Sequence, residues 1–149
     1  MSKIKNIILY GTGGFAREVF HYIKQSEKYQ KIKFKGFLDS NKSLLENKDL
    51  ASFYMGGEDN YKFNIDDYFM IPIADVNIRY SVYNKFKKKN ANFFTYIHDS
   101  VILNNKVIFG EGNIVCPNSV FTDDIKIGDF NIFNINVTVG HDVKIDSFN

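Results

Sequence analysis

A histidine and an aspartate stand side by side near the end of the chain, as His141 and Asp142. Histidine has an ordinary pKa of about 6.5, so its imidazole can take a proton from an attacking amine or hydroxyl near neutral pH. Asp142 could orient or polarise that imidazole, although the alternation of side chains along a strand would point the two apart. The pair predicts a general base, and an exposed turn histidine without a chemical role is the alternative.

Three glycines make a second feature that could do chemistry, in Gly11-Thr12-Gly13-Gly14. Glycine lets the backbone turn tightly and approach a ligand, and the start of the following helix offers unpaired N–H groups to a phosphate. Gly11, Gly13 and Ala16 also satisfy a relaxed dinucleotide fingerprint, with Asp39 at the sequence spacing expected for a ribose ligand. The segment therefore predicts a phosphate-binding turn. An NAD site and a tight turn without a ligand are the alternatives.

The elements around these glycines alternate between strand-like and helix-like patterns. We expect strands over residues 4–10, 32–38, 69–74 and 93–97, and helices over 15–25 and 77–89. Residues 40–65 are polar and receive no assignment, and Asp75 is expected to cap the second helix. The alternation predicts an α/β domain over residues 1–97, a Rossmann-like parallel sheet with helices on its faces.

A different period begins after His98. Apolar residues recur every six positions and, after a one-residue slip, every six again: Ile102, Ile108, Ile114, Val120, then Ile127, Phe133, Val139 and Ile145. A helix repeats every 3.6 residues and a half-buried strand every two, whereas a parallel β-helix places one residue per short face on its axis. The pattern predicts a partial parallel β-helix over residues 98–149. Short antiparallel strands with coincidental spacing are the alternative.

Composition narrows the possible partners. The 149 residues carry a formal net charge of only +2, which argues against nucleic acid or an anionic membrane as the main partner. No apolar run is long enough to span a membrane. The single cysteine, Cys116, fits a reducing, cytoplasmic compartment. The three histidines are scattered, without a His/Asp cluster at ligand spacing, so no metal is expected.

A glycine-rich βαβ start joined to hexapeptide repeats resembles the bacterial acetyltransferases that act on sugars. These are the sialic-acid O-acetyltransferases and the N-acetyltransferases of nucleotide-linked 4-amino sugars. The resemblance covers the whole chain, and it is carried by the segments 10–19, 37–39, 73–79 and 97–98, and by Asn134 with 139–142. It implies a left-handed β-helix, a homotrimer whose β-helices pack side by side, and acetyl-CoA bound between neighbouring β-helices without a metal.

The resemblance also implies roles for residues. His141, assisted by Asp142, is expected to be catalytic, and Asn134, seven residues before the histidine, to hold the sugar. The nucleotide-linked sugar is expected on the N-terminal domain. Phe15 stands where members of the family usually have a histidine. The expected substrate-binding positions are Gly11, Gly13, Gly14, Phe15, Asp39, Asp75 and Asn134.

Two other functions remain open at this point. A non-catalytic module could hold a nucleotide-sugar and use its β-helix only for association, and an NAD-binding protein is a more distant alternative. Residues 98–149 leave room for about two and a half coils of the β-helix. We therefore expect an unusually short or functionally impaired transferase, the front part of a longer sequence, or a partner over the last coil.

Overall fold

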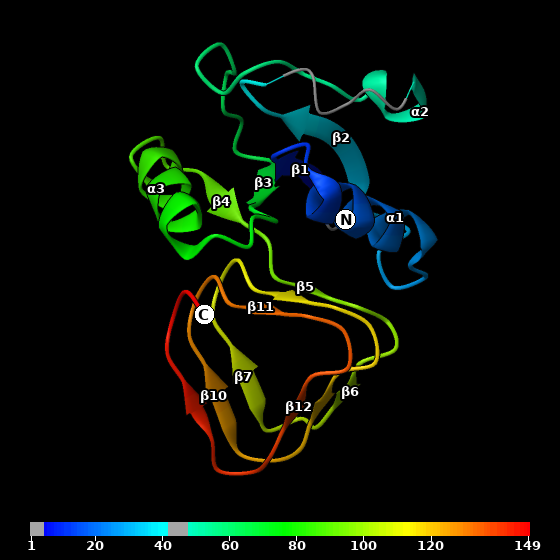
Figure 1. Ribbon diagram of the computed structural model, residues 1–149, viewed down its shortest axis with the longest axis vertical. Coiled ribbons are helices and arrows are strands. Elements are labelled where there is room, and N and C mark those ends of the chain that lie inside the picture. The colour runs from blue at the N-terminus through cyan, green and yellow to red at the C-terminus, as the bar shows by residue number, and fades with distance from the viewer. Residues whose placement is uncertain (1–4, 42–47) are drawn as a thin grey trace. The chain divides into compact units, whose positions relative to one another are not determined.

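The computed structural model describes residues 5–41 and 48–149 (Figure 1). The chain divides into two compact units between Phe93 and Phe94. The first unit contains a parallel sheet with the strand order β2-β1-β3-β4, as the alternating pattern predicts. Its elements are β1 (Asn6–Tyr10), α1 (Gly14–Gln25), β2 (Lys33–Leu38), α2 (Lys48–Ala51), β3 (Asp67–Met70), α3 (Val76–Lys87) and β4 (Asn92–Phe93).

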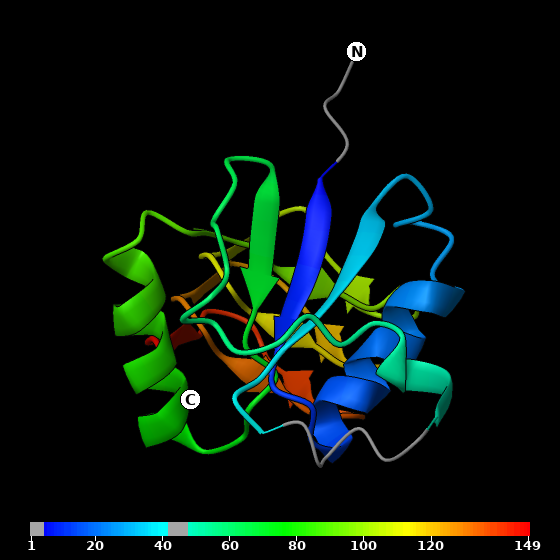
Figure 2. The ribbon, with the colours of Figure 1, turned by 90° about the horizontal axis from the view of Figure 1, so that it is seen from above.

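The two longer helices flank this sheet (Figure 2). The chain leaves β1 for β2 through α1, and it leaves β3 for β4 through α3 in the opposite direction along the sheet. Since such crossovers are right-handed, α1 and α3 cover opposite faces. Phe20 of α1 packs against a cluster of aromatic rings, and so does Phe86 of α3; these clusters are Phe34, Phe37 and Phe53 for the first, and Tyr10, Phe63 and Phe69 for the second.

The segment 93–97, which the sequence predicts as one strand, forms two short strands. β4 pairs with β3 in the first unit, whereas β5 (Tyr96–Ile97) pairs with β8 (Ile114–Val115) in the second. Phe93 and Tyr96 are both buried, so the apolar pattern continues across the point where the chain passes from one unit to the next. Because the apolar pattern is continuous, the sequence alone predicts β4 and β5 as one strand.

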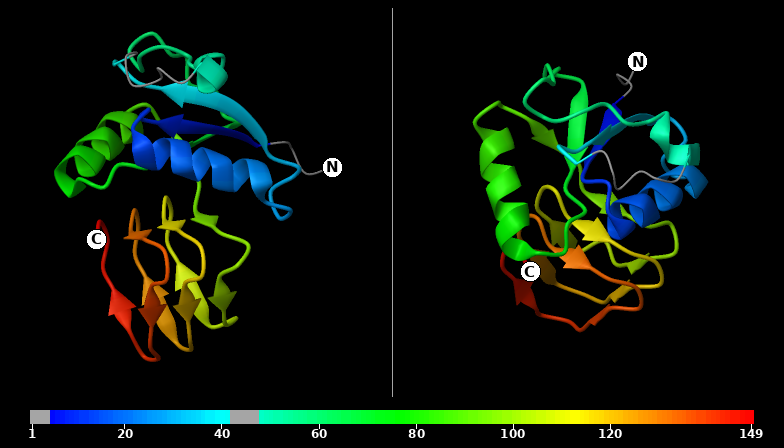
Figure 3. Two further views of the ribbon diagram at one scale, coloured as in Figure 1. Left: turned by 45° about the vertical axis from the view of Figure 1, so that its right-hand side comes forward. Right: turned by 45° about the horizontal axis from the view of Figure 1, so that its top comes forward.

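The second unit is a parallel β-helix, as the period of six predicts (Figure 3). Every strand pairs in parallel with the strand 18 residues away, which excludes the antiparallel alternative. Three sheets result, β5-β8-β11, β6-β9-β12 and β7-β10-β13. The remaining strands are β6 (Ile102–Leu103), β7 (Val107–Phe109), β9 (Val120–Phe121), β10 (Ile125–Ile127), β11 (Ile132–Phe133), β12 (Thr138–Val139) and β13 (Lys144–Ile145).

The axis residues of the early coils lie one position later than predicted. Ile102 and Ile108 are 66% and 61% exposed, whereas the core runs through Val115 and Phe121. The core positions are therefore spaced by six without any slip, at Phe109, Val115, Phe121, Ile127, Phe133, Val139 and Ile145. The sequence is misleading here because both neighbours are apolar in each early strand, so the inward one cannot be distinguished.

The corners of the β-helix have a period of six as well. From the third corner onward, one residue per corner adopts a left-handed backbone conformation, with φ between 48° and 69°: Gly112, Asn118, Asp124, Phe130, Asn136, Asp142 and Phe148. Asparagine, aspartate and glycine tolerate this conformation better than other residues do. Asp142 is thus one of the corner residues, and its conformation determines where its side chain points.

Candidate active site

The glycine turn joins the end of β1 to the start of α1. Gly11 has a φ of 107°, which favours glycine, and its N–H donates to the carbonyl of Leu38 at 2.8 Å. Gly13 is the N-cap residue of α1, and no side chain caps the helix there. A Cβ added at Gly13 would meet no atom of residues 5–41 and 48–149 within 4 Å, and its φ of −66° suits any residue. No packing against these residues and no backbone strain therefore requires glycine at position 13.

Asp39 lies at this turn, as the sequence predicts for a residue that follows β2. Its Oδ2 accepts hydrogen bonds from the N–H and the Oγ1 of Thr12, at 2.9 and 2.7 Å. Its Oδ1 accepts from the N–H of Asn41 at 2.8 Å. The carboxylate thus ties two loops together at the carboxyl ends of β1 and β2. Because each carboxylate oxygen can accept two hydrogen bonds, Oδ1 keeps capacity for a ligand hydroxyl.

The first residues of α1 and α3 lie at the same edge of the sheet, where the strands have their carboxyl ends. Half-buried Phe15 lies in the first turn of α1, beside exposed Gly14. Asp75 caps α3, since its Oδ1 accepts from the N–H of Ile78 at 2.9 Å. The buried Arg79 guanidinium donates to the carbonyls of Ile73 and Ala74, and burial lowers its pKa. A ligand role for Phe15 or Asp75 stays a prediction.

A buried carboxylate that sequence reasoning missed lies near the end of β1. Glu58 belongs to the unassigned segment 40–65, where no periodicity announces a functional residue. Its Oε1 accepts from the Tyr10 hydroxyl at 3.1 Å and from Lys85 Nζ at 2.7 Å. Burial, together with the charge of Glu58 and its hydrogen bond, raises the pKa of Tyr10 to about 12. A glutamate in a glycine-containing loop is the only sequence signal that could have pointed to this group.

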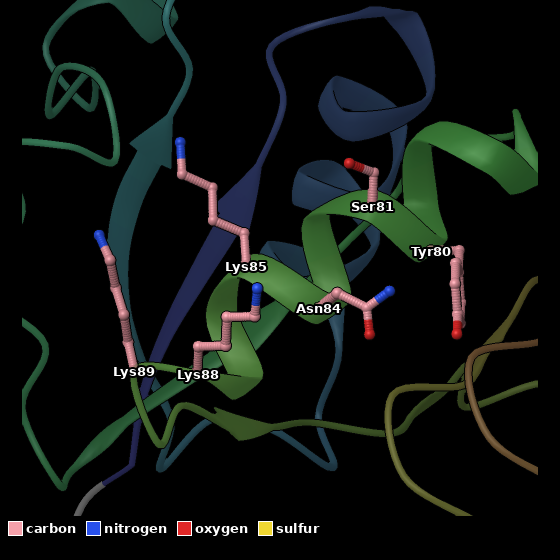
Figure 4. A pocket seen from close by; sticks show the side chains of 6 residues that line it. All are labelled: Tyr80, Ser81, Asn84, Lys85, Lys88 and Lys89. Atoms are coloured by element: carbon pink, nitrogen blue, oxygen red, sulfur yellow. The ribbon is translucent and has the colours of Figure 1, made fainter.

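A hollow of about 630 Å³ lies beside α3 (Figure 4). Lys85 extends from α3 and Lys89 from the turn that follows it, and they bind the side chain and the backbone carbonyl of Glu58, respectively. None of the residues that the sequence singles out as substrate-binding lines this hollow; its lining is Tyr80, Ser81, Asn84, Lys85, Lys88 and Lys89.

His141 and Asp142 meet at a corner of the β-helix. Nδ1 of His141 lies 2.6 Å from Oδ2 of Asp142, although alternation along a strand would separate the two side chains. The left-handed conformation of Asp142, with a φ of 58°, ends that alternation. Since a carboxylate only accepts hydrogen bonds, the tautomer with its proton on Nδ1 satisfies this contact, and in that tautomer Nε2 presents a lone pair. Both side chains are about three-quarters exposed, so Nε2 is accessible to a substrate.

The preceding coil supports this corner. The N–H of Asp142 donates at 3.1 Å to the carbonyl of Asp123, which lies on the preceding coil 19 residues earlier. Lys106, another coil earlier, lies 3.6 Å from a carboxylate oxygen of Asp123 and 3.5 Å from one of Asp124. The positive charge of Lys106 offsets part of the negative charge of the aspartates at these stacked corners.

Asn134 follows β11 as His141 follows β12, so the two residues belong to successive corners. The side chain of Asn134 is exposed, and its Oδ1 accepts from the N–H of Ile135 at 2.8 Å. This bond orients the amide and leaves its NH2 group outward. Its contact with a sugar stays a prediction.

Neither a metal site nor a membrane span occurs in the described part of the chain. Among residues 5–41 and 48–149, no three histidine, cysteine, aspartate or glutamate side chains come together as metal ligands would. No helix in these ranges is both long enough and apolar enough to cross a membrane.

The family follows from the first unit together with its glycine turn. Residues 6–86, more than half of the chain, match the family model of the PglD N-terminal domain. The chain belongs to the PglD N-terminal domain family. No curated protein sequence matches it.

Solved structures extend the likeness of this PglD-family chain to the β-helix. WeeI from Acinetobacter baumannii AYE is 24% identical with a TM-score of 0.80, over 97% of this chain and 68% of that one. The acetyltransferase domain of PglB from Neisseria gonorrhoeae FA1090, in complex with acetyl coenzyme A, is 16% identical with a TM-score of 0.76, over 98% and 69%.

A third neighbour is a histidine-to-asparagine variant of perosamine N-acetyltransferase from Caulobacter crescentus, in complex with CoA and GDP-perosamine. It is 19% identical with a TM-score of 0.75, over 97% of this chain and 67% of the other. The PglD-family chain thus spans about two thirds of the length of these neighbours. At these identities the likeness concerns the fold, a Rossmann-like sheet followed by a short left-handed β-helix.

Proposed function

We propose that this chain is an acetyltransferase that moves the acetyl group of acetyl-CoA to an amino or hydroxyl group of a nucleotide-linked bacterial surface sugar. The observation that carries the proposal is the contact between His141 Nδ1 and Asp142, because it leaves Nε2 as an accessible base. Membership of the PglD N-terminal domain family supports it. So do neighbours that hold CoA, acetyl-CoA or GDP-perosamine on the same fold.

The chemistry is a direct transfer in a ternary complex. The acceptor nitrogen or oxygen attacks the thioester carbonyl while Nε2 of His141 takes its proton. The tetrahedral intermediate then expels the CoA thiolate, which takes this proton from the His141 imidazolium, so that CoA thiol and the acetylated sugar are the products and the neutral base is restored. Asp142 stabilises the imidazolium that forms, and backbone N–H groups of a coil would stabilise the oxyanion. No step uses a metal.

We assign the binding of the nucleotide-linked sugar to the residues that the sequence predicts as substrate-binding. In this proposal the uncapped start of α1, with Gly11, Gly13 and Gly14, receives the phosphates of the nucleotide, and Asp39 accepts from its ribose. Phe15 and Asp75 border the same edge of the sheet, and Asn134 holds the sugar near His141. The open space beside Gly13 supports this arrangement, since a Cβ there would meet no atom of the described part of the chain within 4 Å.

We also propose a homotrimer in the cytoplasm. Large apolar side chains exposed on the β-helix support side-by-side packing of such units; they are Ile102, Leu103, Ile108 and Ile135. The single cysteine, Cys116, is buried and free, as is common for proteins of a reducing compartment.

An acetylation assay with two binding measurements tests the proposal. The chain is incubated with acetyl-CoA and UDP- or GDP-linked amino sugars, and released CoA thiol is measured. Calorimetry with each substrate, and with NAD, then separates the alternatives. Thiol release together with binding of both substrates is expected. Binding of the sugar nucleotide without acetyl-CoA would instead indicate the non-catalytic module, and binding of NAD alone would indicate the dinucleotide alternative.

A further inference from the structure

Glu58 is a buried carboxylate whose two oxygens have different surroundings. The residue is only 6% exposed. Both of its side-chain donors reach the same oxygen, since Tyr10 Oη and Lys85 Nζ lie 3.1 and 2.7 Å from Oε1. The other oxygen, Oε2, is buried and accepts no hydrogen bond from any group in residues 5–41 and 48–149. A buried acceptor left unpaired is destabilising, and because Oε2 is closed off from solvent, a donor from outside the described chain can pair with it only when the side chains that cover it move aside.

This carboxylate is ionised near neutral pH. Burial alone would raise its pKa, but the hydrogen bonds from Lys85 and Tyr10 outweigh it and lower the pKa of Glu58 below its usual range. An ionised carboxylate has acceptors and no donor. Oε2 is therefore a fixed acceptor, and Tyr10 and Lys85 determine its orientation by holding Oε1.

Glu58 lies at the edge of the sheet where α/β proteins bind ligands. Tyr10 is the last residue of β1 and directly precedes Gly11, and the carbonyl of Gly56 accepts from the N–H of Asp39 at 3.0 Å. The segment leading to Glu58 therefore passes the end of β2. Since β1 lies between β2 and β3, and α1 and α3 cover opposite faces, the chain reverses its direction along the sheet at β1. Ligands bind beyond the carboxyl ends of strands at such a point.

We propose that Glu58 reads the base of the nucleotide, with Oε2 accepting a hydrogen bond from the ring N–H of guanine or uracil. This inference rests on the proposed function, in which the substrate is a nucleotide-linked sugar. Sugar hydroxyls both donate and accept, so a fixed acceptor would not choose among them. A base edge has fixed donors and acceptors, and guanine N1–H and uracil N3–H are donors where cytosine N3 is an acceptor.

The variant Glu58→Gln tests the assignment sharply. Because Tyr10 and Lys85 both donate to one oxygen, they orient the amide so that its Oε1 faces them and its NH2 group takes the place of Oε2. The substitution therefore replaces an acceptor by a donor at almost unchanged volume. Binding of GDP, UDP and CDP to the full chain is measured by calorimetry, and a thermal melt of each variant reports folding.

We expect the wild-type chain to bind GDP or UDP more tightly than CDP. Glu58→Gln is expected to weaken the preferred nucleotide by about tenfold or more, while CDP affinity holds or rises. The matched control is Asp59→Asn, which removes the neighbouring charge that also contacts Lys85 at 3.0 Å and should leave all three affinities unchanged.

Two kinds of failure are distinguishable. If the wild-type chain binds none of the three nucleotides, a nucleotide-linked sugar is not its substrate. The proposed function and the base-reading role of Glu58 are then both wrong. If the wild-type chain binds nucleotides but Glu58→Gln changes no affinity, or weakens all three equally, the base-reading role is wrong and the proposed function stands.

Discussion

Among single residues, the candidate site depends on one unusual backbone conformation and one missing side chain. Asp142 adopts a left-handed conformation that brings its carboxylate to His141, and Gly13 leaves the start of α1 open in an ordinary conformation that does not itself require glycine. The residue types and their spacing point to both features from the sequence. The contact itself could not be predicted, because alternation along a strand argues against it and only the corner conformation of Asp142 restores it.

Gly13→Ala separates binding from folding at the glycine turn. The added methyl group meets no atom of the described residues within 4 Å and the backbone conformation is ordinary, so the melting temperature should stay within about a degree of the wild-type value. A methyl group at the helix start should hinder the approach of a diphosphate, and we expect UDP or GDP affinity to fall by about tenfold or more. Calorimetry and a thermal melt of the same samples check this. Unchanged nucleotide affinity would count against the phosphate-binding turn.

Elements show what a pattern can and cannot determine. The alternation before His98 and the period of six after it are sufficient to predict the parallel sheet and the β-helix. The period did not identify the axis, because Ile108 and Phe109 are adjacent and both apolar, and only packing decides that Phe109 lies inward. Glu58 was missed for a different reason: its segment has no period, and its role follows from contacts with β1 and α3.

Gly112→Ala should destabilise the β-helix. Gly112 has a φ of 69°, and an added Cβ would lie 2.4 Å from a ring carbon of Phe130 on the next coil. Strain and overpacking together should lower the free energy of unfolding by about 2–4 kcal/mol. Gly140→Ala is the matched control, since its Cβ would meet nothing within 4 Å and its φ is not in the left-handed region. Equal stability of both variants in urea titrations would contradict the packing described for this corner.

The contact between β1 and Glu58 predicts a loss of stability in alkali. The phenol of Tyr10 has an ordinary pKa of 10.0, which burial and the carboxylate of Glu58 raise to about 12 in the folded chain. Above pH about 10 the unfolded chain loses this proton first, so deprotonation favours unfolding. The contribution is complete below pH about 10 and is lost as the pH rises towards about 12.

Thermal melts across that range measure the effect. Tyr10→Phe has no proton to lose at this position, so its melting temperature should decline less steeply with pH than that of the wild-type chain. Parallel declines of the two proteins would show that Tyr10 does not titrate with a raised pKa.

In the whole molecule, one chain of 149 residues joins a Rossmann-like parallel sheet to a β-helix. The sequence suffices to predict both folds and their order, and the PglD N-terminal domain model and the neighbouring structures agree with them. What it cannot supply is the set of groups that close over a substrate, since those depend on contacts between residues far apart in the chain.

Exposed apolar side chains on the β-helix predict that the chain assembles into a trimer. Ile102 and Ile135 are 66% and 52% exposed on the β-helix, and burying such surface between copies would stabilise a trimer. Sedimentation equilibrium should give three times the chain mass of 17.3 kDa. Replacing both isoleucines by glutamate should shift the mass towards that of one chain. A wild-type monomer at all concentrations would refute the proposed assembly.

The proposed function requires His141 as the general base, and the turnover of His141→Ala decides whether it has that role. With acetyl-CoA and a nucleotide-linked amino sugar, we expect the kcat for thiol release to fall by about a hundredfold or more, with acetyl-CoA binding retained. His21→Ala, at an exposed position of α1, is the matched control and should keep wild-type turnover. Near-wild-type turnover of His141→Ala would contradict the account.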